Sequence, residues 1–147
     1  MSQHTYSITI ERPVEEVFAY MDDVSREREW QPAIRSARVE PEGATAVGTK
    51  KHYSSEFMGR EVKNTYVTTV FEKNRRVVYE TTPQSTVQAI ASFTWESTER
   101  GTLVTMSVLG EPKGVLRFVP RGVLDRVYQK EIKDTLTRLK SCLEAAG

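Results

Sequence analysis

The feature that most constrains the fold is a change in hydrophobic period late in the chain. Residues 34–110 contain runs rich in Val, Thr, Tyr, Phe and Trp, separated by short turn sequences such as Pro41-Glu42-Gly43 and Glu99-Arg100-Gly101. These runs fall near residues 34–41, 48–58, 61–72, 76–82, 86–97 and 102–110. Because short links between long strands form hairpins, the pattern predicts an antiparallel meander of six strands.

Beyond Pro120 the apolar residues recur every three or four positions instead of every two. The stripe consists of Leu124, Tyr128, Ile132, Leu136, Leu139 and Leu143, broadened by Val123 and Val127. This spacing predicts an amphipathic helix of roughly 22 residues. Pro120 and Gly122 are expected to separate it from the preceding segment.

The N-terminal region predicts one more strand and two short helices. Tyr6, Ile8 and Ile10 alternate with polar residues, which is typical of a half-buried strand. Pro13 is well placed at the first position of a helix. The apolar face of that helix would consist of Val14, Val17, Phe18 and Met21, and Ser25 is expected to cap a second short helix. His4 is assigned to an N-terminal tail.

Together these elements predict a single α+β domain over residues 1–147, in the order βααββββββα. A seven-stranded antiparallel sheet cannot stay flat, because the twist between strands accumulates. A long C-terminal helix laid across the concave face would fill only part of the hollow. We therefore expect a cavity between the helix and the curved sheet that wraps around it.

Charge and cysteine content exclude several classes of protein. The 21 basic and 20 acidic residues give a net charge of +1, which argues against a dedicated nucleic-acid binder. The single cysteine, Cys142, excludes an internal disulfide framework and fits a reducing compartment. No apolar run reaches the length of a membrane span, and the first residues do not resemble a signal peptide. The expected location is cytoplasmic.

Several short motifs, in their order and spacing, resemble those of a known superfamily. They are residues 8–18 (ITIERPVEEVF), Trp30-Gln31-Pro32, Val47-Gly48-Thr49, Gly59-Arg60, Gly101-Thr102 and residues 139–144 (LKSCLE). The chain resembles the START/Bet v 1-like, or SRPBCC, superfamily, and especially its polyketide cyclase/dehydrase-like branch. The resemblance covers nearly the whole chain and implies the helix-grip fold. The superfamily includes carriers of hydrophobic ligands, cyclases, hydrolases and co-chaperone modules, so the fold alone does not decide the activity.

Alternation along the strands predicts which side chains face the cavity. In residues 61–72 the inward set would be Val62, Asn64, Tyr66, Thr68 and Val70, unless a bulge inverts part of it. In residues 48–58 we favour Tyr53, Ser55 and Phe57 over His52, Ser54 and Glu56. The predicted ligand-binding residues are Trp30, Tyr53, Phe57, Asn64, Tyr66, Thr68, Tyr79, Ala91, Phe93, Trp95, Met106, Phe118, Val119, Leu124 and Tyr128. Such a lining suits a lipid-like, aromatic or polyketide-like molecule.

Candidates for catalysis are few. His52, Tyr66 and Tyr79 could orient and deprotonate a polyketone, but the neighbours of His52, among them Lys51, are typical of a solvated strand face. Residues 26–29, with alternating Arg and Glu, are likewise interpreted as a solvated helix surface. No metal-binding, nucleotide-binding or nucleophile motif is present, so neither a metal nor a cofactor is expected.

Three hypotheses follow. The first is a non-catalytic binder or carrier of a small hydrophobic ligand. The second is an enzyme of the cyclase, aromatase or dehydratase type that works without a metal. The third is a protein-interaction module, which would show a large exposed apolar patch instead of an enclosed void. The chain would be a monomer or a homodimer.

A further hypothesis concerns three arginines. Arg117, Arg121 and Arg126 are expected at the cavity entrance, where they would bind a carboxylate or phosphate head group.

Overall fold

The computed structural model describes residues 2–57, 59–112 and 117–145. The strands are β1 (Ser2–Ile10), β2 (Ile34–Glu40), β3 (Lys50–Phe57), β4 (Arg60–Glu72), β5 (Arg76–Thr81), β6 (Val87–Thr98) and β7 (Gly101–Pro112). The helices are α1 (Val14–Asp22), a 3₁₀ turn η1 (Val24–Arg26), α2 (Glu27–Trp30) and α3 (Arg121–Ala145). The predicted α+β class and the predicted order of elements are confirmed.

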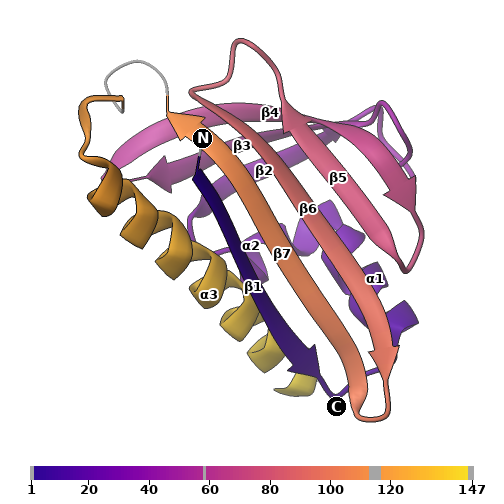
Figure 1. The fold of residues 1–147 in the computed structure, drawn as a ribbon. Coiled ribbons are helices and arrows are strands. Elements are labelled where there is room, and N and C mark those ends of the chain that lie inside the picture. The colour runs from indigo at the N-terminus through magenta and orange to yellow at the C-terminus, as the bar shows by residue number, and fades with distance from the viewer. Residues whose placement is uncertain (1, 58, 113–116, 146–147) are drawn as a thin grey trace.

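All seven strands form one antiparallel sheet in the order β1-β7-β6-β5-β4-β3-β2. Consecutive strands from β2 to β7 are neighbours, as the short turns predict, and β1 joins the free edge of β7. The sheet bends strongly, and α3 runs diagonally beside β1 and against α2 (Figure 1). This is the predicted helix-grip arrangement of a curved sheet around a C-terminal helix.

The core lies between α3, α1, α2 and the inner face of the sheet. Its largest buried side chains include Trp30, Phe93, Trp95, Leu136 and Leu139. The buried positions of α3 are Leu124, Tyr128, Ile132, Thr135, Leu136, Leu139 and Leu143, so the predicted apolar stripe is the buried face. Packing is therefore tight toward the C-terminal end of α3.

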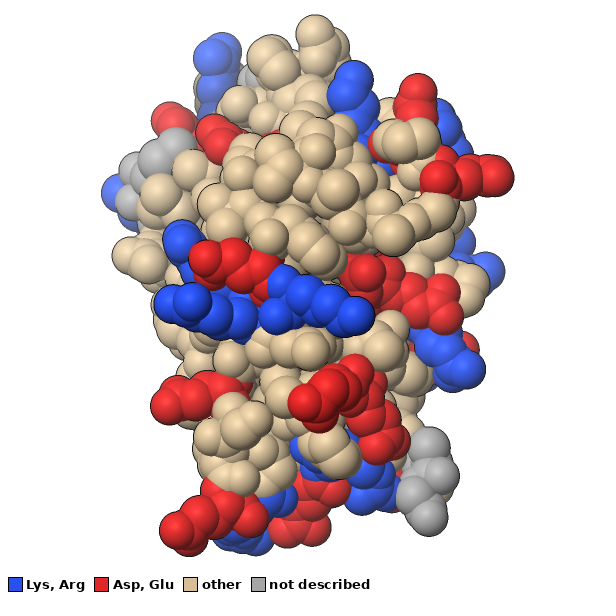
Figure 2. All heavy atoms as spheres, turned by 90° about the vertical axis from the view of Figure 1, so that its right-hand side faces the viewer, with Lys and Arg blue, Asp and Glu red and all other residues tan. Residues whose placement is uncertain are grey.

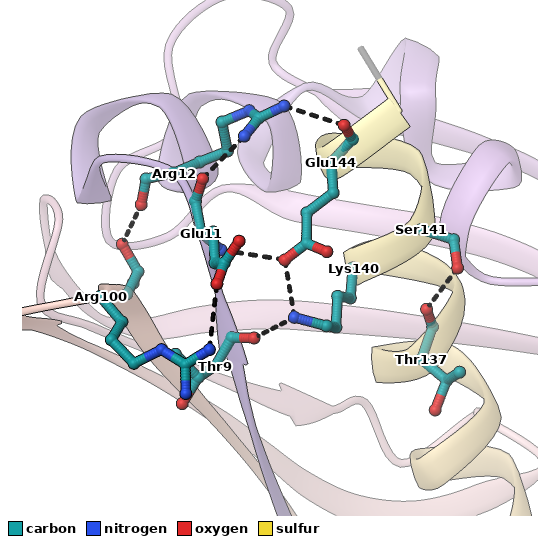
Figure 3. Close-up of polar contacts among 9 residues, drawn as sticks. Thr9, Glu11, Arg12, Arg100, Thr137, Lys140, Ser141 and Glu144 are labelled. Atoms are coloured by element: carbon teal, nitrogen blue, oxygen red, sulfur yellow. Dashed lines mark hydrogen bonds and ion pairs between the residues drawn. The ribbon is translucent and has the colours of Figure 1, made fainter. Parts of the chain in front are cut away.

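The C-terminal end of α3 is tied to the end of β1 and to the turn that follows it (Figure 3). The Glu144 Oε2 atom accepts hydrogen bonds from the Glu11 backbone N–H at 3.0 Å and from Lys140 Nζ at 2.6 Å. Lys140 also donates to the Thr9 carbonyl at 2.6 Å, and Arg12 donates to the Glu144 carbonyl at 2.9 Å. These contacts fix the helix that forms one wall of the cavity.

Three local predictions are wrong. A register shift between Thr68 and Val70 inverts the end of β4, so that Phe71, and not Val70, packs inward with its ring 5.8 Å from that of Phe18. Ser25 caps no helix; it lies within η1, where its N–H donates to Asp23 Oδ1 at 3.0 Å. His4 is not in a tail but in β1, where its ring stacks on Tyr128.

The outer surface carries charges of both signs. On the face seen in Figure 2, a band of Lys and Arg side chains crosses the middle and is flanked by Asp and Glu side chains, and a broad area above it carries neither. None of the helices among the described residues is long and apolar enough to cross a membrane.

Candidate functional site

A cavity of about 590 Å³ lies between the concave face of the sheet and α3. Strands β3 to β7 provide its walls, and α1, α2 and α3 close the remaining sides. This volume falls within the range of about 300–1,000 Å³ that is usual for small-molecule sites. The predicted cavity therefore exists, and it is large enough to hold an aromatic or lipid-like molecule.

The interior is mainly apolar and aromatic. The Phe93 ring lies 6.2 Å from that of Trp30, 6.4 Å from that of Tyr79 and 6.0 Å from that of Trp95. The small residues Ala89 and Ala91 also line the cavity on β6, and their short side chains leave the space that larger residues would fill. Mutually packed aromatic rings therefore form a large part of the cavity wall.

The exposed lining residues mark the mouth of the cavity. They come from the α2–β2 connection (Pro32), the β3–β4 hairpin (Glu56 and Gly59) and the middle of α3 (Lys130 and Asp134). Lys130 pairs with Asp134 at 2.7 Å. Glu56 pairs at 2.5 Å with Arg35 of the neighbouring strand. The mouth is thus polar, and its charged groups largely neutralise one another.

A buried ion pair lies inside the cavity. Lys51 on β3 and Glu27 on α2 are 2% and 1% exposed, and both line the cavity. Lys51 Nζ lies 3.1 Å from Glu27 Oε1, to which the Tyr53 hydroxyl also donates at 3.0 Å. Gln31 donates to the other carboxylate oxygen of Glu27. Buried charges require partners of this kind, because an isolated charge would lose its hydration without compensation.

Burial and pairing shift the pKa values of these groups. Burial disfavours the Lys51 ammonium, but the carboxylate of Glu27 and the neighbouring Tyr79 hold the pKa of Lys51 above its usual value. Burial raises the pKa of Glu27, and Lys51 opposes this shift. Burial also raises the pKa of Asp22, a half-buried neighbour that lines the same part of the cavity. Lys51 is therefore a protonated hydrogen-bond donor at neutral pH.

A second titratable group lies on the α3 wall. Burial, together with the charge of Asp134, raises the pKa of Glu131 to about 7. Burial and the charge of Glu131 raise the pKa of Tyr128 to about 12. Burial, the neighbouring Tyr128 and the charge of Glu131 raise the pKa of Tyr66. The cavity therefore contains neutral phenols and a carboxyl group that titrates near neutral pH.

Ten of the fifteen predicted ligand-binding residues line the cavity. They are Trp30, Tyr53, Asn64, Tyr66, Tyr79, Ala91, Phe93, Trp95, Met106 and Tyr128. The favoured orientation of β3, with Tyr53 and Ser55 inward, is the observed one. The side chain of Phe57 lies outside the described residues.

Four predicted residues lie elsewhere. Thr68 is buried opposite Tyr79 but does not reach the void. Leu124 packs in an apolar cluster with Val62 and Tyr128, and Val119 lies against that cluster, but neither Leu124 nor Val119 lines the void. Phe118 is 73% exposed and cannot be part of the lining.

The catalytic candidates are divided between the two faces of the sheet. Tyr66 and Tyr79 line the cavity, but His52 lies on the outer face. There its Nδ1 atom lies 2.9 Å from Thr65 Oγ1, and its Nε2 atom lies 2.9 Å from Glu40 Oε2. His52 therefore cannot act on a molecule in the cavity. Within the part of the chain that the structure describes, no group of three or more His, Cys, Asp or Glu residues could hold a metal ion.

Two residues that sequence reasoning placed at the surface, Lys51 and Glu27, are the most buried charged groups of the cavity. One feature of the sequence could have indicated that Lys51 points into the cavity. If Tyr53 and Ser55 point inward, strand alternation places Lys51 on the same face. No comparable signal identified Glu27, because its burial depends on how α2 packs against the sheet.

Comparisons with known proteins agree with the geometry. The family model described as "Polyketide cyclase / dehydrase and lipid transport" matches residues 1–144. No curated protein matches this chain. A START superfamily protein from Mycobacterium smegmatis is 12% identical, with 99% of each chain covered and a TM-score of 0.83.

Two further solved structures share the fold at low identity. The di-domain ARO/CYC protein BexL is 16% identical with a TM-score of 0.74, over 95% of this chain and 49% of that one. The Aha1 dimer from Colwellia psychrerythraea is 17% identical with a TM-score of 0.69, over 98% of this chain and 97% of that one. At these identities the likeness establishes the fold and not the ligand.

Proposed function

Because this chain belongs to the polyketide cyclase/dehydrase and lipid transport family, we propose that it binds a small, mainly apolar molecule between the sheet and α3. The observation that carries this proposal is the cavity of about 590 Å³, lined by aromatic and aliphatic side chains and open at a polar mouth. When a ligand fills a cavity of this kind, the apolar surfaces of both ligand and lining are removed from water. This burial is the driving force for binding.

The surface argues against a module whose main task is to bind another protein. Among the described residues only Val47 and Phe118 are large hydrophobic side chains with high exposure. A stable protein interface normally has an apolar centre built from several such residues. The apolar surface of this molecule faces the internal cavity instead, which favours a small ligand.

The test is native mass spectrometry of the full chain purified without organic solvent. We expect an adduct of one small molecule per protein, which is released by organic extraction and leaves a folded protein. Re-addition of the extract should restore the adduct and raise the midpoint of thermal unfolding, because a ligand that binds only the folded state stabilises it. The absence of any adduct, together with no thermal shift from added apolar compounds, would contradict the proposal.

A second candidate function is a metal-independent enzyme of the cyclase or dehydratase type. The observation that favours it is Glu131, a cavity-lining carboxyl group with a pKa of about 7. A group that titrates near the working pH is suited to general acid–base catalysis. Incubation with a synthetic poly-β-ketothioester, compared with Glu131→Gln, would test this function. An equal rate of cyclisation with both proteins would remove Glu131 as the catalytic group.

A further inference from the structure

We infer that the ligand carries a neutral carbonyl oxygen, and that this oxygen accepts a hydrogen bond from Lys51 at the buried end of the cavity. This inference rests on the proposed function and adds the chemical class of the ligand. Three observations support it. They are the hydrogen-bond donors and acceptors around the Glu27–Lys51 ion pair, the charges of the residues that line the cavity, and the free-energy cost of burying an ion pair.

The acceptor side of the ion pair is already occupied. Glu27 Oε1 accepts from both Lys51 and Tyr53, and Glu27 Oε2 accepts from Gln31. Three donors therefore surround one buried carboxylate. Glu27 itself therefore has little capacity left to accept from a ligand hydroxyl or amine. A further acceptor nearby among the described residues is the buried Asp22 Oδ1, and burial raises the pKa of this carboxyl group, which favours its protonated form.

The donor side is not fully used. A lysine ammonium has three N–H groups. One is directed at Glu27, and the ammonium lies 4.9 Å from the centroid of the Tyr79 ring, where that phenol provides a second partner. The third N–H of Lys51 has no hydrogen-bond partner among the residues that the structure describes.

Trp30 provides a second donor on the same side of the cavity. It is 2% exposed and lines the cavity, and its indole Nε1–H has no hydrogen-bond partner within the described part of the chain. Glu27 and Trp30 are three residues apart on α2, so they lie on the same face of that helix. A buried indole N–H normally finds an acceptor. The buried end of the cavity thus offers donors and calls for an acceptor.

The charge of the lining excludes an anionic acceptor. The lining contains five acidic residues, Asp22, Glu27, Glu56, Glu131 and Asp134, and two basic ones, Lys51 and Lys130. Lys51 is already neutralised by Glu27, so a ligand carboxylate would be a buried charge without a counter-ion. Arg117, Arg121 and Arg126 are not among the lining residues and offer no compensation. The acceptor is therefore an uncharged oxygen, as in a ketone, an ester or a quinone.

Lys51 binds the oxygen but does not attack the carbonyl carbon. An amine must be unprotonated to form a Schiff base, and the carboxylate of Glu27 keeps Lys51 in its charged form. The buried pair also supports a role in recognition, because two well-packed apolar side chains at these positions would often give equal or greater stability.

The test uses three naphthalene derivatives substituted at the same ring position: the ketone acetonaphthone, the hydrocarbon ethylnaphthalene and the acid naphthoic acid. Dissociation constants are measured by isothermal titration calorimetry with the full chain. We expect the ketone to bind about tenfold more tightly than the hydrocarbon, because a hydrogen bond from a charged donor discriminates by this order. The acid should bind more weakly than either neutral compound.

The variants separate recognition from folding. Lys51→Met combined with Glu27→Gln removes both charges with little change in volume, and Lys50→Met is the matched control on the exposed side of the same strand. The ratio of ketone to hydrocarbon affinity should lose most of its roughly tenfold preference in the double variant, where Trp30 is the remaining donor, and stay near the wild-type ratio in Lys50→Met. Trp30→Phe, which keeps an aromatic ring but removes the N–H, should lower the ratio by a smaller factor.

The carbonyl stretching frequency of bound acetonaphthone reports the hydrogen bond to the oxygen and does not depend on how well the side chains pack. It should lie lower in the wild-type complex than in the double-variant complex, because a charged donor weakens the C=O bond. Equal affinities of ketone and hydrocarbon for the wild type, or tightest binding of the acid, would overturn this inference and leave the proposed function standing. No binding of any of the three compounds would overturn both.

Discussion

Lys51 and Glu27 form an ion pair at 3.1 Å inside a mainly apolar and aromatic cavity, where neither side chain is more than 2% exposed. The two residues come from different layers of the molecule, since Lys51 lies on β3 and Glu27 on α2. The pair therefore joins the short helices to the sheet, and it provides the polar group that an apolar ligand would meet.

The first prediction concerns the free energy of unfolding. Glu27→Ala leaves a buried lysine without its counter-ion, and we expect a loss of about 3–5 kcal/mol. Lys51→Met should be similarly costly, because it leaves the Glu27 carboxylate buried. The double variant Glu27→Gln/Lys51→Met should lose less than either single variant. Urea denaturation of the four proteins measures these differences.

The exposed pair Lys130–Asp134 is the control for that comparison. Lys130→Met should change the free energy of unfolding by no more than about 1 kcal/mol, because solvent screens surface ion pairs. Equal effects of Lys51→Met and Lys130→Met would show that the cavity pair is solvated, contrary to the structure.

The second prediction concerns the volume of the cavity. Ala91 on β6 faces the void, so Ala91→Phe should occupy part of the space that a ligand needs. We expect at least about a tenfold loss of affinity for the neutral fluorescent probe N-phenylnaphthylamine, equivalent to about 1.4 kcal/mol. The control is Thr94→Phe on the exposed face of the same strand, which should leave the affinity unchanged. A similar loss in both variants would mean that the probe binds elsewhere.

The third prediction concerns pH. Burial raises the pKa of Glu131 from its ordinary value of 4.5 to about 7, so the folded protein binds this proton more tightly than the unfolded chain does. The stabilising contribution of the protonated form is present below about pH 4.5 and is lost as the pH rises through about 7.

Glu131→Gln removes this dependence. The stability of the wild type relative to Glu131→Gln should fall by about 1–3 kcal/mol between pH 4.5 and pH 7.5, measured by urea denaturation at each pH. Glu80→Gln, at an exposed position of β5, is the control and should show no such trend relative to the wild type. A constant difference between the wild type and Glu131→Gln across this range would contradict the burial of the carboxyl group.

The fourth prediction concerns the attachment of α3. The Glu11 amide donates to Glu144 Oε2, and this contact joins the end of β1 to the last turn of the helix (Figure 3). Glu144→Ala removes the acceptor, so the Glu11 amide should exchange its hydrogen faster, as measured by NMR. Ser141→Ala is the control, because the Ser141 hydroxyl donates to the Thr137 carbonyl within the helix and to no other residue that the structure describes. Unchanged exchange at Glu11 in Glu144→Ala would show that the contact does not hold the helix end.

Most of the fold could be predicted because its signals are local. Period-two runs ended at short turns, and the stripe from Leu124 to Leu143 specified the buried face of α3 directly. The errors arose where local signals do not decide. The register shift in β4 turned Phe71 inward in place of Val70, and nothing in the residues around Thr68 indicates where such a shift occurs.

The aromatic part of the lining could also be predicted, because alternation places Ala91, Phe93 and Trp95 on one face of β6. The charged part could not. Lys51 and Glu27 are 24 residues apart in the sequence. They can form their ion pair only after α2 has packed against β3. Taken singly, each residue is of a type that is almost always exposed. Their burial is a property of the pair, which single-residue reasoning cannot detect.

The measurement that tests the central claim most directly is the detection of NMR contacts between bound acetonaphthone and the methyl groups of the protein. We expect intermolecular nuclear Overhauser effects to Ala91 and Met106, two methyl-bearing residues of the cavity wall. Val47, whose methyl groups are exposed on the surface, should show none. Contacts to Val47 without contacts to Ala91 and Met106 would contradict the claim that this protein binds its ligand inside the helix-grip cavity.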